Sequence, residues 1–200
     1  MDIETLQHTI LSSMLVHVPF DGWGKRAKDM ALNDTNISEA EFLRAFPEGI
    51  PQVLEYFMQR LDDSMCEALG KLPLSTMKIH EKVEAAIMLR LAAAEPFREA
   101  MRKAVAYYAF PFHADQSIKR LYRTTDTIWR AIGDHPTDFS FYTKRLSLGA
   151  IYTSTLLFWL DDYSESHQET KAFLSRRLYD LFKFHMLKQK LRSPFSMRNA

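Results

Sequence analysis

The chain has 200 residues, of which 46% are hydrophobic and 26% charged, which excludes a disordered or fibrous protein and predicts one globular domain. Its six glycines and single cysteine argue against phosphate-cradling glycine loops and exclude an intramolecular disulfide. The net charge of +1 conceals a gradient, because residues 1–50 carry four basic and eight acidic side chains while residues 171–200 carry eight basic and one acidic.

Apolar residues recur at helical spacing along most of the chain, and no segment alternates long enough to predict strands, so we expect an all-α fold. A first helix over about residues 2–17 should end before Pro19 and Gly22. A second runs from about Trp23 to Leu32, and Ser38 with Glu41 forms a capping box that opens a third. Residues 1–50 therefore predict a helix-turn-helix-like part.

Longer helices follow and predict a bundle over residues 51–190 and a short tail over 191–200, all within one domain. Asp115 should cap one of them. The expected helices cover about residues 51–69, 76–93, 95–110, 115–132, 141–160 and 169–190. In the helix that Asp115 opens, one apolar stripe should face the core and the arginines and lysine should lie outside it. The stripe consists of Ile118, Leu121, Tyr122, Thr125, Ile128, Trp129 and Ile132, and the basic residues outside it are Lys119, Arg120, Arg123 and Arg130.

The helix over 141–160 is apolar on both sides, which predicts burial on both sides. One side would face the core, and the other a second copy or a ligand; a wholly internal helix is the alternative. The last helix is amphipathic and basic, so it can lie on an anionic membrane, although the final helix of a bundle with a solvated charged face is the more common explanation of such a pattern.

No chemistry-bearing motif stands out. The seven histidines lack metal-binding spacing, and no nucleophile elbow is present, so the sequence indicates neither a metal site, nor a catalytic residue, nor a cofactor. The longest apolar stretch, residues 150–160, is too short to span a bilayer, and we expect a soluble protein.

The first half resembles the amino-terminal part of TetR regulators, whose helix-turn-helix ends in an aromatic residue and a proline turn, here Phe46-Pro47. DNA-binding members need a basic recognition helix, whereas this one begins Ser38-Glu39-Ala40-Glu41. We therefore expect no nucleic acid partner.

The second half resembles the ninth complementation group of the coenzyme Q biosynthesis lipid-binding proteins. The most specific segment reads Asp138-Phe-Ser-Phe-Tyr-Thr-Lys-Arg145, followed by Ile151-Tyr152 and Asp161-Asp162-Tyr163-Ser164. The resemblance implies a TetR-like fold, commonly dimeric, that has lost DNA binding and holds isoprenoid lipids. It also implies presentation of those lipids to a membrane-associated di-iron demethoxyubiquinone hydroxylase, without hydroxylase activity in the chain itself.

Three groups of site residues follow from the pattern and the resemblance together. An isoprenoid quinone or other lipid is expected at Trp129, Ile151, Tyr152, Thr155, Leu156 and Trp159. Docking of the hydroxylase is expected at Asp138, Phe141, Tyr142, Lys144 and Arg145. Attraction to an anionic membrane is expected at Arg176, Arg177, Lys183, Lys188, Lys190 and Arg192.

We expect a homodimer in the bacterial cytoplasm, peripheral to the inner membrane, because the amino terminus lacks the features of a transit peptide. The matrix side of the mitochondrial inner membrane is the alternative location. A TetR-type repressor with a hydrophobic effector is the alternative function, and an unrecognised small enzyme is a third.

Overall fold

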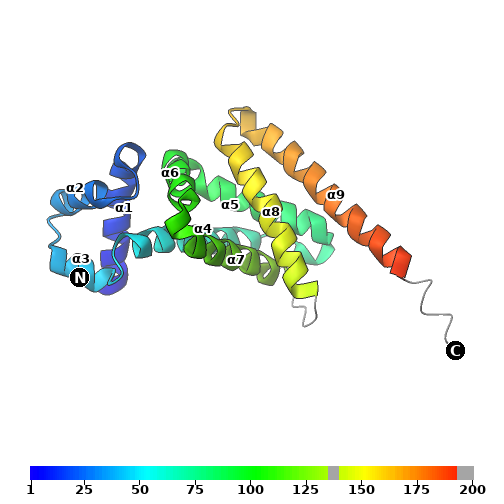
Figure 1. Cartoon of the computed structure of the whole chain (residues 1–200), viewed down its shortest axis with the longest axis horizontal. Coiled ribbons are helices and arrows are strands. Elements are labelled where there is room, and N and C mark those ends of the chain that lie inside the picture. The colour runs from blue at the N-terminus through cyan, green and yellow to red at the C-terminus, as the bar shows by residue number, and fades with distance from the viewer. Residues whose placement is uncertain (135–139, 193–200) are drawn as a thin grey trace. The chain divides into compact units, whose positions relative to one another are not determined.

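The computed structural model describes residues 1–134 and 140–192, with side chains for residues 1–134, 145–181 and 183. The described residues form helices and no strand, which confirms the all-α prediction. The α-helices are α1 (Ile3–Asp21), α2 (Lys25–Thr35), α3 (Glu39–Ala45), α4 (Ile50–Leu69), α5 (Ile79–Ala94), α6 (Arg98–Ala109), α7 (Ala114–Ala131), α8 (Ser140–Leu160) and α9 (Gln168–Arg192) (Figure 1). Short 3-10 turns are η1 (Leu74–Thr76), η2 (Glu95–Phe97), η3 (Pro111–His113) and η4 (Glu165–His167).

Backbone contacts group the chain into two compact units. The first unit comprises residues 1–65 and 92–123, and the second comprises residues 66–91 and 124–200. This grouping differs from the expected division at residue 50, because α6 packs on α1 and brings a later part of the chain to the first helices.

The helix-turn-helix-like part forms as the sequence predicts, with one difference. The α1 helix continues through Pro19 and ends at Gly22, whose φ of 73° reverses the backbone. A proline in the last turn of a helix removes one backbone hydrogen-bond donor. The helix therefore loses one hydrogen bond but does not end at Pro19. The capping box at the start of α3 is confirmed, since Ser38 and Glu41 satisfy each other's backbone donors.

In the first unit, aromatic side chains bind these short helices to the longer ones. The indole of Trp23 donates a 3.0 Å hydrogen bond to the Ala100 carbonyl in α6, and its ring lies 5.4 Å from that of Phe57 in α4. Phe42 and Phe46 pack as a tilted pair at 5.9 Å, and both are buried. The Trp23 contacts hold the connection between α1 and α2 against α4 and α6, whereas the Phe42–Phe46 pair packs along α3.

In the second unit, α8 and α9 lie side by side and run in opposite directions (Figure 1). Leu174 and Leu178 of α9 are buried, as are Val83, Ile87 and Leu91 of α5. One face of α8 is buried, but Leu146 and Leu157 on another face are 79% and 48% exposed. The alternative of a wholly internal helix is therefore wrong, whereas burial of the second side of α8 by a second copy or a ligand stays a prediction.

The α7 helix differs most from the sequence prediction. Ile118 and Tyr122, expected in the core, are 69% and 42% exposed, whereas Arg120, expected outside, is buried. The reason is electrostatic, because the Arg120 guanidinium pairs with Glu55 and Asp62 of α4. Asp115 lies inside the first turn instead of capping it, because η3 runs directly into α7.

Candidate functional site

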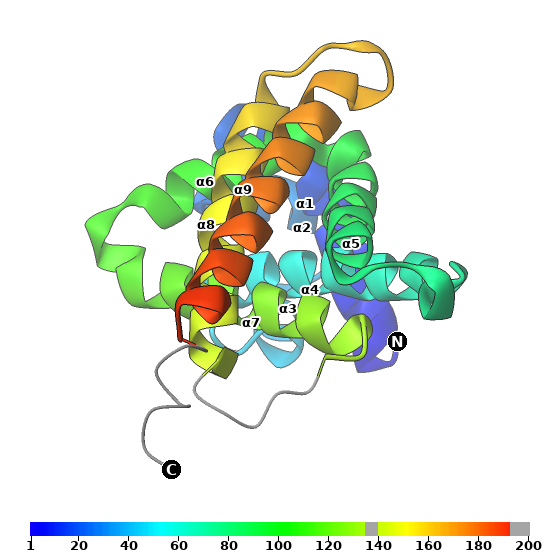
Figure 2. The same cartoon turned by 90° about the vertical axis from the view of Figure 1, so that its right-hand side faces the viewer.

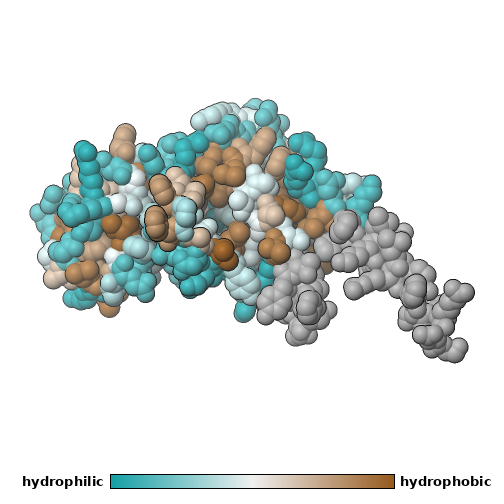
Figure 3. Space-filling view, viewed as in Figure 1, coloured by the Kyte–Doolittle hydropathy of each residue, from teal (hydrophilic) through white to brown (hydrophobic). Residues whose placement is uncertain are grey.

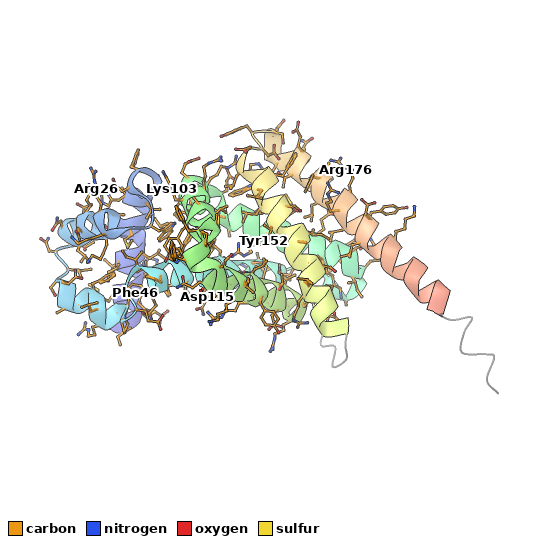
Figure 4. All side chains as sticks on the ribbon, viewed as in Figure 1. Arg26, Phe46, Lys103, Asp115, Tyr152 and Arg176 are labelled. Carbon is orange, nitrogen blue, oxygen red and sulfur yellow. The ribbon has the colours of Figure 1, made fainter. Side chains whose placement is uncertain are left out.

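The six residues expected to bind lipid are all buried in the second unit. Trp129 belongs to α7 and the other five to α8, and none is more than 8% exposed. Spacings of three and four place Tyr152, Thr155 and Trp159 on one face of α8. Figure 4 shows Tyr152 on this helix. The six residues form a buried aromatic and apolar face, and binding of lipid by them stays a prediction.

The hydroxyl of Thr155 is an unusual feature of this face. Thr155 has no exposed surface, and among the described residues its hydroxyl has no hydrogen-bond partner. A helical threonine commonly bonds the carbonyl four residues earlier, but the Ile151 carbonyl already accepts a 2.9 Å bond from Ser154. A buried polar group without a partner costs about 1–3 kcal/mol, so this hydroxyl is a candidate ligand contact.

Arg90 is a functional candidate that the sequence reasoning missed. It is 1% exposed in α5, donates a hydrogen bond to the Tyr152 phenol oxygen, and its guanidinium carbon lies 5.2 Å from the Tyr152 ring centroid. The available signal was a lone charge in an otherwise apolar stretch, residues 85–94. Arg90 fixes the tyrosine that neighbours Thr155 on α8.

Two pockets are described in the structure, and both lie in the first unit. The larger, of 460 Å³, is lined mainly by polar and charged side chains of α4 and α7, including Glu55, Lys119, Arg120 and Arg123. The smaller, of 250 Å³, is lined by Glu4, Thr5, His8, Tyr56 and Arg60. Neither pocket is lined by the six buried residues at which lipid is expected.

The docking segment is described in part. Asp138 lies outside the described residues, and the side chains of Phe141, Tyr142 and Lys144 lie outside the described side chains. Arg145 is described and is 3% exposed; its Nε and Nη2 lie 2.7 Å and 2.5 Å from Oδ1 of Asp126 in α7. The expectation that Arg145 offers a surface charge is therefore wrong, because its charge is neutralised inside the second unit.

The basic face of α9 is exposed where the structure describes it. Arg176, Arg177 and Lys183 are exposed, and Figure 4 shows Arg176 on α9. The guanidinium of Arg177 lies 5.0 Å from the Phe173 ring centroid. The side chains of Lys188, Lys190 and Arg192 lie outside the described side chains.

Asp162 joins the end of α8 to the start of α9. Its buried carboxylate accepts hydrogen bonds of 2.8 Å from the backbone N–H groups of Ser164 and Thr170, and one of 2.5 Å from the Thr170 hydroxyl. Burial acts to raise the pKa of Asp162, but these hydrogen bonds outweigh it and hold the pKa well below its usual range. Asp162, in the segment Asp161-Asp162-Tyr163-Ser164, therefore has a structural role: it holds together the turn between α8 and α9.

The carboxylates of the recognition helix α3 also have partners. Glu39 binds the buried ammonium of Lys28 at 2.7 Å, and Glu41 accepts from the backbone and hydroxyl of Ser38, which lowers the Glu41 pKa. Two of the other basic residues in this part are paired as well, Lys25 with Asp29 and Arg26 with Asp21. The basic surface that reads a DNA groove is not formed by these residues.

Among the described side chains, residues 1–134, 145–181 and 183, no three metal-ligating groups lie together. No helix in the part of the chain that the structure describes is long and apolar enough to cross a bilayer.

Comparisons with known proteins agree with the sequence resemblance. Residues 114–185 match the family model described as COQ9. The chain is 30% identical over 193 residues to the mitochondrial ubiquinone biosynthesis protein COQ9 of Homo sapiens, across 93% of this chain and 61% of that protein. It is 26% identical over 189 residues to the Drosophila melanogaster protein of the same name, across 92% of this chain and 58% of that protein. The chain thus spans about three fifths of the length of these relatives.

A solved structure supports the fold. The TetR transcriptional regulator from Nitrosomonas europaea ATCC 19718 superposes with a TM-score of 0.71 at 20% identity, covering 88% of this chain and 97% of that one. The predicted TetR-like fold is confirmed.

Proposed function

Because this chain is a relative of the COQ9 proteins and has a TetR-like fold, we propose that it acts in ubiquinone biosynthesis as a non-enzymatic protein that binds isoprenoid quinone lipids. The observation that carries the proposal is the Thr155 hydroxyl, which lies on a buried aromatic face and has no hydrogen-bond partner among the described residues. A quinone head has carbonyl oxygens that can accept this hydrogen bond, and an isoprenoid tail matches the apolar side chains around it.

A lipid can reach this face only if α8 separates locally from its neighbours, because each of these side chains is 8% exposed or less. Each methylene transferred from water contributes about 0.8 kcal/mol, so a long tail offsets the contacts that α8 loses when it separates from its neighbours. We propose Trp129, Ile151, Tyr152, Leu156 and Trp159 as the residues that contact the tail.

The test is the lipid that co-purifies. Organic extraction and mass spectrometry of the wild-type protein should recover an isoprenoid quinone or a precursor, and Thr155→Val should retain several-fold less of it. Thr153→Val is the matched control, since Thr153 is exposed on the same helix. Equal retention by Thr155→Val and wild type would contradict a role for the hydroxyl, and recovery of no lipid would contradict the function. The larger change Thr155→Trp is unsuitable, because overpacking a fully buried position destabilises the fold.

We further propose that the start of α8 docks the di-iron demethoxyubiquinone hydroxylase and presents the bound lipid to it. Phe141 would be the apolar anchor, with Asp138, Tyr142 and Lys144 around it, while Arg145 supports the segment from inside through Asp126. Phe141→Lys should abolish co-purification with the hydroxylase and leave the thermal melt unchanged. Retained binding would contradict this assignment.

The exposed face of α9 supports a proposal of reversible attraction to an anionic membrane. Basic residues near such a surface contribute about 1 kcal/mol each, so Arg176, Arg177 and Lys183 with the later basic residues would hold the protein loosely. Salt should release it. The proposed location is peripheral to the inner membrane, on its bacterial cytoplasmic side or its mitochondrial matrix side.

We also propose a homodimer. The exposed face of α8 combines Leu146 and Leu157 with the small residues Ala150 and Thr153, which permits close helix packing against a second copy. Analytical ultracentrifugation of wild type and Leu146→Lys tests this, and an unchanged mass would contradict the α8 interface.

A further inference from the structure

Arg90 is a buried charge on an otherwise apolar stretch of α5. Hydrophilic side chains lie over much of the surface that Figure 3 displays, and arginine ordinarily belongs there, but Arg90 is 1% exposed. Val83, Ile87 and Leu91 of the same helix are buried apolar side chains. Burial of a guanidinium is costly, and apolar residues in place of buried ionic groups commonly leave a protein as stable or more stable. Stability is therefore a weak explanation for Arg90.

The Arg90 side chain reaches Tyr152 of α8. Its guanidinium donates a hydrogen bond to the phenol oxygen, and its central carbon lies 5.2 Å from the centroid of the Tyr152 ring. Both residues belong to the second unit, in which α9 also packs along α8 (Figure 2). Arginine keeps its charge in proteins, and a phenol oxygen that accepts from a cation becomes a stronger donor through its own O–H group. Arg90 therefore fixes the Tyr152 ring and polarises its hydroxyl.

Tyr152 shares its face of α8 with a second hydroxyl. Thr155 lies three residues further along the helix, is fully buried, and its hydroxyl has no hydrogen-bond partner among the described residues. Leu156 and Trp159 follow on the same face and are 8% and 0% exposed. The face thus carries two hydroxyls in one turn and mainly apolar groups in the next. This order matches a lipid that has an oxygen-bearing ring at one end and a hydrocarbon tail at the other.

We propose, on the basis of the lipid-binding function proposed above, that Arg90 acts through Tyr152 to select lipids whose head is an oxygen-bearing ring. One ring oxygen accepts a hydrogen bond from the Tyr152 hydroxyl and a second accepts from Thr155, while the side of the Tyr152 ring contacts the beginning of the tail. Arg90 orients and polarises the phenol without touching the lipid itself, so it is a positioning residue that sets specificity.

The selectivity has a physical origin in the two hydroxyls. A plain isoprenoid hydrocarbon can fill the apolar part of the face, but it offers no acceptor to Tyr152 or Thr155. A site built to hydrogen-bond a polar group discriminates strongly against an analogue that lacks this group, whereas an apolar surface distinguishes poorly between tails. The head of the lipid should therefore be recognised through Tyr152 and Thr155, and the tail should add affinity with little selectivity.

The experiment titrates the full chain with a short-tail ubiquinone, with a linear isoprenoid hydrocarbon of the same tail length and with a fatty acid, and measures bound lipid by extraction and mass spectrometry. Tyr152→Phe keeps the ring and removes the hydroxyl, so it should weaken quinone binding about tenfold and leave hydrocarbon binding unchanged. Arg90→Gln should weaken quinone binding similarly, and the double variant should lose no more than either single one, because both changes interrupt the same contact. Tyr56→Phe is the matched control, since Tyr56 is a half-buried tyrosine of the first unit.

An infrared measurement separates recognition of the head from a general loss of structure. The carbonyl stretch of the bound quinone should lie at lower frequency than in a hydrocarbon solvent, and it should move back upward in Tyr152→Phe; this variant decides the outcome alone if Arg90→Gln does not fold. An unchanged preference for quinone over hydrocarbon in Tyr152→Phe would overturn the role of Arg90 and Tyr152. Tighter binding of the fatty acid than of the quinone would do the same, because Arg90 would then attract an anionic head. Binding of none of the three lipids by the wild type would overturn the lipid-binding function, and this selectivity with it.

Discussion

The helix-turn-helix-like part and the buried face of α8 differ in whether their buried polar groups have hydrogen-bonding partners. In α2 and α3 the buried Lys28 binds Glu39, and Ser38 and Glu41 cap each other. In α8, Thr155 is fully buried and its hydroxyl has no partner among the described residues. The helix-turn-helix-like part therefore pairs its charged side chains with one another. The buried face of α8, in contrast, keeps a hydroxyl that could still donate a hydrogen bond to a ligand.

This difference indicates where a ligand would gain the most binding free energy. A polar group already paired within the protein must lose a bond before it contacts anything else, so new contacts there add little free energy. An unpaired buried hydroxyl gains a full hydrogen bond from a suitable ligand. Breaking paired groups should therefore destabilise the chain, and removing the unpaired one should not.

The largest expected effect comes from Asp126→Asn. This change leaves the buried Arg145 guanidinium without its carboxylate, and breaking a buried ion pair costs about 3–5 kcal/mol. Urea unfolding monitored by circular dichroism measures the loss. The control is Asp115→Asn, which removes an exposed pair with Lys119 and should cost about 1 kcal/mol or less. Similar losses in both variants would show that burial of Arg145 does not matter.

Asp162→Asn should destabilise the chain by about 2–3 kcal/mol, because three hydrogen bonds to a buried carboxylate lose their ionic partner. The folded pKa of Asp162 lies below the unfolded value of 3.8, so its stabilisation is present above that pH and is lost as the pH falls through the lowered folded pKa. The stability gap between wild type and Asp162→Asn should therefore shrink in acid. A gap that stays constant down to strongly acidic pH would contradict the assignment.

A smaller effect, about 1 kcal/mol, is expected from Glu39→Gln, since Lys28 keeps part of its hydrogen bonding while the carboxylate lies partly in solvent. Neither this variant nor wild type should shift a duplex DNA fragment in a gel at submicromolar protein. Sequence-selective, salt-sensitive binding by wild type would contradict the interpretation of α3 and favour the repressor alternative.

The smallest effect should come from Thr155→Val, which should leave the free energy of unfolding unchanged within about 1 kcal/mol or raise it. The substitution removes a buried hydroxyl that has no described partner and keeps the side-chain volume. Thermal unfolding of lipid-free protein measures it. A loss comparable to that of Asp162→Asn would mean that the hydroxyl is satisfied within the protein.

Local chemistry made much of this molecule predictable. The capping box at Ser38 requires only neighbours three residues apart, and the buried face of α8 follows from the periodicity of its apolar residues. The family resemblance likewise rests on short continuous segments, and its agreement with COQ9 relatives and a TetR-like structure needed no knowledge of tertiary contacts.

Tertiary structure alone decided which charges are buried. Arg90, Arg120 and Arg145 are each 7% exposed or less because a phenol or carboxylate reaches them from another helix. Helical periodicity predicts that an arginine is exposed, because the pattern reflects only how strongly each side chain is hydrated. It does not include the partner from another helix that replaces the water. The exposure of Ile118 has the same origin, because paired charges between α4 and the first half of α7 occupy the inner side there. The second half of the predicted stripe is buried as expected, at Thr125, Ile128, Trp129 and Ile132.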